Sequence, residues 1–178
     1  MTKTSELDTW LAEEAAVQAQ LRQGVGAGLA DPEQARGLSG LEILQRSMAG
    51  ELPYSTMSQT LDFVLIGVSD GSATFQGTPG AQHLNPMGSV HGGWFATLLD
   101  SALGCAVWTK MPAGRLYTTT ELSVNLVRAL TPQVPRVRAI GQVIHCGRQL
   151  ATAEARLVGP DGTLYAHATT TCLVFDRK

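Results

Sequence analysis

Hydrophobic and polar positions change their period along the chain. Over residues 5–22, apolar residues recur near helical spacing, which predicts an amphipathic helix. "GVGAGLADP" (24–32) then predicts a break, because glycine and proline are poor helix formers. Ser39 and Glu42 have capping-box spacing, and the apolar positions after them end at Gly50, which predicts a second, short helix. We expect the first helix to be a packing arm and the second to be a lid or packing helix.

From Tyr54 onward apolar and polar residues alternate, as they do in strands with one buried face. "SDG" (69–71) predicts a hairpin turn between two such strands. Three or four further strands are expected in the second half of the chain, at roughly 116–128, 134–146, 149–158 and 162–175.

One segment between these strands has helical spacing and is apolar on most sides. Its apolar positions are Phe95, Leu98, Leu99, Ala102, Leu103 and Ala106. Such a helix must be covered, and only the sheet is available to cover it. The sequence therefore predicts an α+β fold, in which a curved antiparallel β-sheet wraps around one long central α-helix. Residues 1–50 are expected to form an N-terminal helical extension, and residues 51–178 the main domain.

Composition narrows the function classes. A chain of 178 residues, with 44% hydrophobic and 16% charged residues, fits one globular domain. Its net charge of -2 offers no field for nucleic acid or for an anionic membrane, so we expect neither as a partner. The N-terminal residues are acidic where a signal peptide needs an apolar core, and no apolar run reaches membrane-spanning length, which favours a cytoplasmic location.

The stretch "LNPMGSVHGGWFATLLDSALG" (84–104) is the main candidate for chemistry. Gly92 and Gly93 stand where a loop becomes the central helix. The first N–H groups of a helix lack internal partners and carry the positive end of its dipole, so they suit an oxyanion that develops on a carbonyl. The alternative is that the two glycines only make a tight turn.

Asp100 interrupts the apolar stripe of the same helix. Burying an unpaired carboxylate costs several kcal/mol and raises its pKa toward the range of a general base. Asp100 follows Gly92 by eight residues, about two helical turns, so one chain cannot bring both to the same carbonyl. A two-fold partner that supplies the acid would solve this geometry. The alternative is a hydrogen-bonded structural acid.

His91 has two interpretations, an orienting role beside the glycines and a catalytic one. The other histidines show no metal-ligand spacing with it, and the chain contains no GxSxG, GxGxxG or P-loop motif. The three cysteines lie far apart without a CxxC motif, and we expect them to be small buried residues. We therefore expect no metal and no cofactor.

The stretch "HLNPMGSVHGGWFATLLDSALG" resembles the HxNxxGxxHGGxxxxxxD signature of hotdog-fold thioesterases of the PaaI-like group, relatives of the second type of 4-hydroxybenzoyl-CoA thioesterase. "YTTTELSVNLVRAL" and "HCGRQLATAEARLVGPDGTLYAHATTTCLVF" also resemble strands of this group, so the resemblance covers about 54–175. It implies a hotdog fold that hydrolyses an acyl-CoA or aryl-CoA to free acid and CoA without a cofactor. It also implies at least a homodimer, and a homotetramer as a dimer of dimers.

The resemblance also implies residue roles. Asn85 corresponds to a residue that helps hold the thioester or the attacking water, and the Gly92 N–H to the group that polarises the thioester carbonyl. Asp100 corresponds to a carboxylate from the opposite subunit, acting as a general base or as a nucleophile that forms a mixed anhydride. Thr119 matches a water-positioning hydroxyl, although Thr118 and Thr120 leave the register open.

Substrate contacts are expected at two places. A guanidinium group binds phosphate well, so arginines are candidates to bind the phosphates of CoA. The alternative is that they are only solvated charges at strand edges. The candidates are Arg128, Arg136, Arg138 and Arg148. "CGR" (146–148) resembles a CoA-facing turn, which favours Arg148 and gives Gly147 a role in close backbone approach. Gly93, Met87 and Trp94 are further candidates for substrate contacts. Met87 and Trp94, with Phe95 and Leu98, are expected either to line an acyl pocket or to be part of the hydrophobic core. Gly104 stands where some relatives carry threonine, which indicates a roomier pocket there.

Two other functions remain as alternatives. An enoyl-CoA hydratase on the same fold needs an acid and a histidine close to the α,β-carbons, whereas here the histidine precedes two glycines and the acid comes late. A non-catalytic acyl-CoA-binding module would not need a buried acid. The sequence therefore favours hydrolysis.

Overall fold

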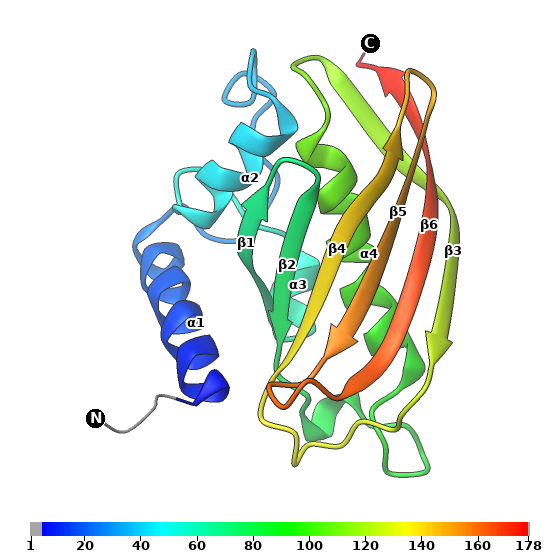
Figure 1. Ribbon diagram of the computed structural model, residues 1–178. Helices are drawn as coiled ribbons and strands as arrows, with labels where there is room; N and C mark the ends of the chain where they lie inside the picture. Colours follow the sequence, from blue (N-terminus) through cyan, green and yellow to red (C-terminus); the bar gives the residue numbers. More distant parts are fainter. Residues whose placement is uncertain (1–4, 178) are drawn as a thin grey trace.

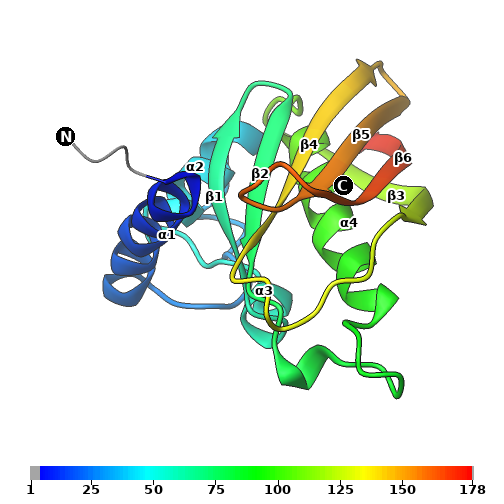
Figure 2. The same ribbon diagram turned by 60° about the horizontal axis from the view of Figure 1, so that its bottom comes forward.

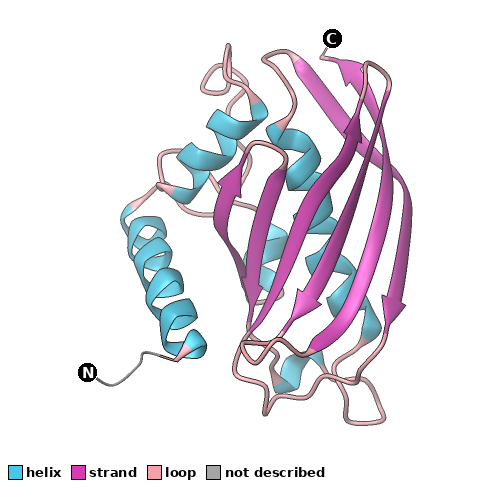
Figure 3. Cartoon of the chain, in the orientation of Figure 1, coloured by secondary structure: helices cyan, strands magenta, loops and turns pink. Residues whose placement is uncertain are grey.

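The computed structural model describes residues 5–177. Helices and strands follow each other in the expected order (Figures 1 and 3). The elements are α1 (Glu6–Gln23), α2 (Gly40–Met48), α3 (Thr56–Thr60), β1 (Phe63–Ser69), β2 (Ser72–Gly77), a 3-10 turn η1 (Ala81–His83), α4 (Gly92–Thr109), β3 (Arg115–Leu126), β4 (Val137–Cys146), β5 (Leu150–Val158) and β6 (Leu164–Asp176).

The six strands form one sheet in the order β1-β2-β4-β5-β6-β3, and every neighbouring pair is antiparallel. The sheet is open rather than closed into a barrel, and it curves around α4, which packs on its concave face (Figure 2). The predicted α+β arrangement of a curved antiparallel sheet around one central helix is confirmed.

The helix α4 is held in the sheet by leucines and by one glycine. Leu98, Leu99 and Leu103 are fully buried in the hydrophobic core, as the spacing predicted. At Gly141 of β4 an added Cβ would lie 2.4 Å from the carbonyl oxygen of Ala102, so only glycine permits this approach of strand to helix. The same contact fixes the height of α4 against the sheet, and with it the position of Asp100.

The helix α1 is attached to the sheet by polar contacts more than by an apolar stripe. The Arg136 guanidinium contacts the Glu14 carboxylate at 2.6 Å, and Arg138 pairs with Glu13 and lies 4.3 Å from the centroid of the Trp10 ring. One donor nitrogen of each arginine pairs with an acid of α1, while Arg136 Nη1 donates to the Pro135 carbonyl and Arg138 Nε to Gln76 Oε1. Neither arginine is therefore merely a solvated charge, and a contact with CoA phosphates stays a prediction. The packing-arm interpretation of α1 accounts for both arginines.

One local expectation is wrong. Residues after Tyr54 form the short helix α3 before β1 begins, whereas the alternation of apolar and polar residues predicts a strand there. Ser55 and the largely polar residues after it form a helical turn instead. Asp62 then turns the chain into β1 with a φ of 54°. The predicted capping box of Ser39 with Glu42 is present, and α1 begins with a further, unpredicted one, of Ser5 with Asp8. The division into an extension over 1–50 and a domain over 51–178 stays a prediction.

Within residues 5–177, none of the helices is both long and apolar enough to cross a membrane.

Candidate active site

The loop before α4 ends in a histidine cap. His91 is the N-cap residue, and its Nδ1 accepts a hydrogen bond from the Gly93 N–H at 2.9 Å. The His91 N–H is donated to the carbonyl of His83 at 2.8 Å, and the Val90 N–H to that of Leu130 at 2.9 Å. Because Nδ1 is an acceptor here, the neutral imidazole carries its proton on Nε2. The geometry corresponds to the orienting interpretation of His91.

Gly92 is the first residue of α4, and its N–H has no hydrogen-bond acceptor among residues 5–177. The His91 cap provides an acceptor for the Gly93 N–H and leaves the Gly92 N–H free, within the described part of the chain, at the positive end of the helix dipole. A Cβ added at Gly92 would lie 3.0 Å from Cδ1 of Leu126, so the absence of a side chain leaves room for Leu126 beside the start of α4. An N–H at the positive end of a helix dipole is the geometry that an oxyanion requires.

Asn85 holds the loop together. Its Oδ1 accepts from the N–H groups of Met87 at 2.9 Å and Ser89 at 3.3 Å, and its Nδ2 donates to the Ser89 hydroxyl at 2.9 Å. All three contacts are made within the loop that precedes Gly92. In this chain alone Asn85 therefore orders the loop, and a contact with thioester or water stays a prediction.

Asp100 lies half-buried in the middle of α4 and faces β3. Its Oδ1 accepts a hydrogen bond from the Thr119 hydroxyl at 3.2 Å. Of the three neighbouring threonines, Thr118 is exposed and Thr120 donates to the Thr171 carbonyl across a bulge in β3. The structure thus selects Thr119 among the three registers that the sequence left open.

Burial raises the pKa of the Asp100 carboxyl above its ordinary value, and the hydrogen bond from Thr119 opposes part of that rise. The carboxylate opens into a depression of about 460 Å³ that is lined by Asp100, Trp108, Leu116, Tyr117, Thr118 and Thr119. A partly desolvated carboxylate at the wall of a depression is suited to take a proton from a bound water.

Gly92 and Asp100 do not meet within one chain. Eight residues of α-helix separate their Cα atoms by about 12 Å at 1.5 Å per residue. Each chain therefore carries two separate half-sites, an unpartnered N–H at the start of α4 and a carboxylate two turns further along. A carbonyl bond is only about 1.2 Å long, which is far shorter than this distance of about 12 Å along the helix. The two groups of one chain therefore cannot act together on the same carbonyl.

The expectation of a roomier pocket at Gly104 is wrong, because the Tyr117 hydroxyl fills the space. A Cβ added at Gly104 would lie only 2.5 Å from the Tyr117 Oη. Tyr117 comes from β3, two residues before Thr119, and burial raises the pKa of its phenol well above the usual range. No spacing within one segment signals this pairing, since it joins residues of separate elements.

Cys105 lies one turn beyond Asp100 without acting as a nucleophile. Burial, together with the Asp100 charge, raises the pKa of the Cys105 thiol to about 12, and burial also raises that of Cys172. A protonated thiol is a poor nucleophile. These two cysteines are packing residues, as expected.

The predicted substrate contacts are spread over both ends of α4. Trp94 is core, because its ring is 3% exposed and its Nε1–H donates to the Leu61 carbonyl at 2.8 Å. Met87, 87% exposed, lies at the tip of the loop. Arg128 is exposed two residues beyond Leu126, at the Gly92 end. Gly147 and exposed Arg148 lie in the β4–β5 turn, at the opposite end (Figure 1).

Part of the chain is similar to a known protein family. Residues 87–166 match the family model of the thioesterase superfamily, a range that contains both half-sites. No curated protein matches the chain.

Solved structures share the fold. A putative thioesterase from Ralstonia eutropha, named a phenylacetic acid degradation-related protein, is 27% identical, with a TM-score of 0.67 over 74% of this chain and 98% of that one. The E. coli PaaI protein of the phenylacetic acid degradation operon is 21% identical, with a TM-score of 0.63 over 70% and 87%. A thioesterase family protein from Silicibacter pomeroyi is 23% identical, with a TM-score of 0.66 over 78% and 99%.

Proposed function

We propose that this chain, a hotdog-fold thioesterase of the PaaI-like group, hydrolyses an acyl-CoA or aryl-CoA to the free acid and CoA. The observation that carries the proposal is the pair of half-sites on α4. One is the Gly92 N–H, without an acceptor among the described residues, and the other is the half-buried Asp100 carboxylate.

Each half-site supplies what thioester hydrolysis needs. The Gly92 N–H donates to the thioester carbonyl oxygen and stabilises the negative charge that develops there. Asp100 takes a proton from water, whose oxygen forms the new bond to the carbonyl carbon. The C–S bond then breaks, the thiolate leaves and takes a proton, and the products are the acid and the CoA thiol. Direct attack by Asp100 to form a mixed anhydride, followed by hydrolysis, gives the same products.

The working site needs at least two copies of the chain, because one copy separates its two groups by about 12 Å along the helix. We propose a homodimer in which Gly92 of one protomer faces Asp100 of the other, and a homotetramer built from two such dimers. Arg128, Gly147 and Arg148 are the proposed contacts of CoA. Arg148 lies in a turn, and the Arg115 guanidinium donates to its carbonyl.

The hydratase alternative is weaker for a structural reason. Nδ1 of His91 accepts a hydrogen bond from the Gly93 N–H, so this nitrogen caps the helix and does not exchange a proton with the α,β-carbons of a substrate. The binding-module alternative does not explain why a carboxylate with a raised pKa lies in the depression.

A thiol-release assay with a panel of acetyl-, octanoyl-, decanoyl-, benzoyl- and phenylacetyl-CoA tests the proposal. We expect free CoA to appear with at least one ester, without added metal or cofactor. If purified protein that is folded by circular dichroism releases no thiol from any of them, the proposed function is wrong.

The pH dependence of hydrolysis tests the role of Asp100 as base. Only the ionised carboxylate accepts a proton, so kcat/KM falls as the pH drops through the raised pKa of Asp100. Thr119→Val removes the hydrogen bond that lowers this pKa, and we expect the acidic limb to move to higher pH. Thr120→Val is the control, because that hydroxyl donates to the Thr171 carbonyl instead. An acidic limb that stays in place in Thr119→Val contradicts the assignment.

A further inference from the structure

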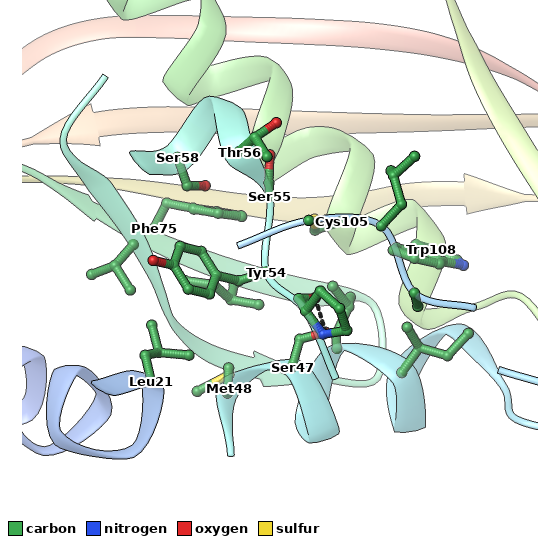
Figure 4. Close-up of a pocket in the computed structure, with 18 residues that line it drawn as sticks. Leu21, Ser47, Met48, Tyr54, Ser55, Thr56, Ser58, Phe75, Cys105 and Trp108 are labelled. Carbon is green, nitrogen blue, oxygen red and sulfur yellow. Dashed lines mark hydrogen bonds between the residues drawn. The ribbon is translucent and has the colours of Figure 1, made fainter. Parts of the chain in front are cut away.

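A second cavity, of about 290 Å³, lies between the N-terminal helices and α4 (Figure 4), and Trp108 lines both this cavity and the Asp100 depression. The cavity lining is mainly apolar, and it combines side chains of three sources. The N-terminal segment gives Leu29, Ile43 and Met48, the sheet gives Phe75, and α4 gives Cys105 and Trp108.

The N-terminal segment is fixed tightly over this cavity. An added Cβ at Gly40, the first residue of α2, would lie 2.0 Å from the Trp108 carbonyl oxygen, and the Gly40 N–H donates to the Met111 carbonyl at 2.9 Å. The extended strand near Ala27 pairs with Tyr54, through the Gly28 N–H at 2.9 Å and the Tyr54 N–H to Gly26 at 3.2 Å. The cavity is therefore a formed space with fixed walls, rather than a loose gap between elements.

Trp108 is the wall shared by the cavity and the Asp100 depression, so an acyl chain that reaches from one space into the other has to pass beside its ring. Its side chain lines both spaces, and its ring lies 6.5 Å from the ring of Tyr117, which lines the depression. Cys105 also lines the cavity, one turn from Asp100. The chain that supplies the carboxylate thus also carries an apolar space one side chain away from it.

The volume indicates the class of ligand. A protein cavity of about 150 Å³ holds benzene, and this one is about twice as large, which leaves room for roughly eight to twelve carbons. A benzoyl or phenylacetyl group would leave about half of it empty. Leu29, one of the lining residues, is 96% exposed, so an apolar side chain stands in solvent beside the cavity.

We propose that this cavity holds the straight acyl chain of a medium-chain acyl-CoA, and that the N-terminal segment thereby sets the acyl specificity. The proposal rests on the proposed function, since the thioester is to be cleaved at Asp100 while its chain passes Trp108. Each methylene buried here is expected to raise kcat/KM about fourfold, up to roughly ten carbons.

Filling the cavity tests the proposal. Met48→Trp places a large side chain in the cavity from α2, and Gln45→Trp, exposed on the same helix and outside the lining, is the matched control. We expect Met48→Trp to lower kcat/KM for decanoyl-CoA by more than about tenfold while changing acetyl-CoA turnover less than about twofold. Gln45→Trp leaves both unchanged. An unchanged chain-length profile in Met48→Trp overturns the proposal, as does an equal loss for both esters in a variant with wild-type thermal stability.

Binding of sodium decanoate separates this proposal from the proposed function. A ligand that binds the folded state raises the melting temperature, so decanoate should stabilise the wild type and Gln45→Trp but not Met48→Trp. This result supports the cavity even if no thioester is cleaved. Equal stabilisation of all three proteins, or of none, overturns the cavity assignment even if thioesters are cleaved.

Discussion

Asp100→Asn should lower kcat by about 10²–10⁴-fold, because an amide cannot take the proton that a general base removes from water. The change is nearly isosteric, and an amide oxygen in the place of Oδ1 still accepts the Thr119 hydroxyl, so the fold and the depression should persist. The variant should bind acyl-CoA with near wild-type affinity, measured by calorimetry, while thiol release is nearly lost.

Asp70→Asn is a suitable control for this substitution. Asp70 is an exposed acid at the β1–β2 turn, paired with Lys110 at 2.7 Å, and it lies outside both half-sites. Its loss should leave turnover unchanged, since an exposed ion pair contributes about 0–1 kcal/mol to stability. Turnover of Asp100→Asn equal to that of the wild type would remove the carboxylate from the mechanism. Joint loss of binding and turnover would make it a structural acid instead.

Local sequence patterns predicted α4, the strands and the capping box of α2, because each depends on residues within a few positions of one another. Ser39 with Glu42 and the leucines of α4 are such cases. The Gly92 N–H followed from the same logic, since a helix start leaves donors without partners wherever it stands in the fold.

Features that join distant elements escaped prediction. The choice of Thr119 depends on the bulge between Thr119 and Glu121, which shifts the register of β3 against β6. The Tyr117 hydroxyl over Gly104 and the pairing of Arg136 with Glu14 depend on how separate elements approach. The cavity of about 290 Å³ has the same origin, since its walls come from α1, α2, the sheet and α4. No spacing within one segment encodes these contacts.

Gly92→Pro should lower kcat/KM by about 10²–10³-fold, the usual effect of removing one oxyanion donor. Proline has no N–H, and position 92 is one at which the fold tolerates proline. The first helical residue tolerates proline, and His91 before it has extended angles, φ -63° and ψ 137°, that suit a residue preceding proline. The deleted N–H has no acceptor among residues 5–177, so little folding free energy should be lost.

Gly92→Ala is the matched variant, because it adds a Cβ but keeps the N–H. That Cβ would lie 3.0 Å from Leu126 Cδ1, the end of a flexible side chain that can move by a few tenths of an ångström. Thiol-release kinetics should therefore show a far smaller loss in Gly92→Ala than in Gly92→Pro. Equal losses would mean that the glycine acts only through space for the approaching substrate, without its N–H.

Mixing the two disabled proteins tests the shared site directly. If each site takes Gly92 from one protomer and Asp100 from the other, a heterodimer of Gly92→Pro and Asp100→Asn contains one site with both groups intact. The other site of that heterodimer lacks both groups. Random pairing makes half of the dimers mixed, so co-refolded protein should recover about a quarter of wild-type turnover, whereas either variant alone recovers almost none. Sites built within single chains would give no recovery, because every chain would then carry one disabled group, and this outcome would exclude the two-protomer mechanism even if both single variants are inactive.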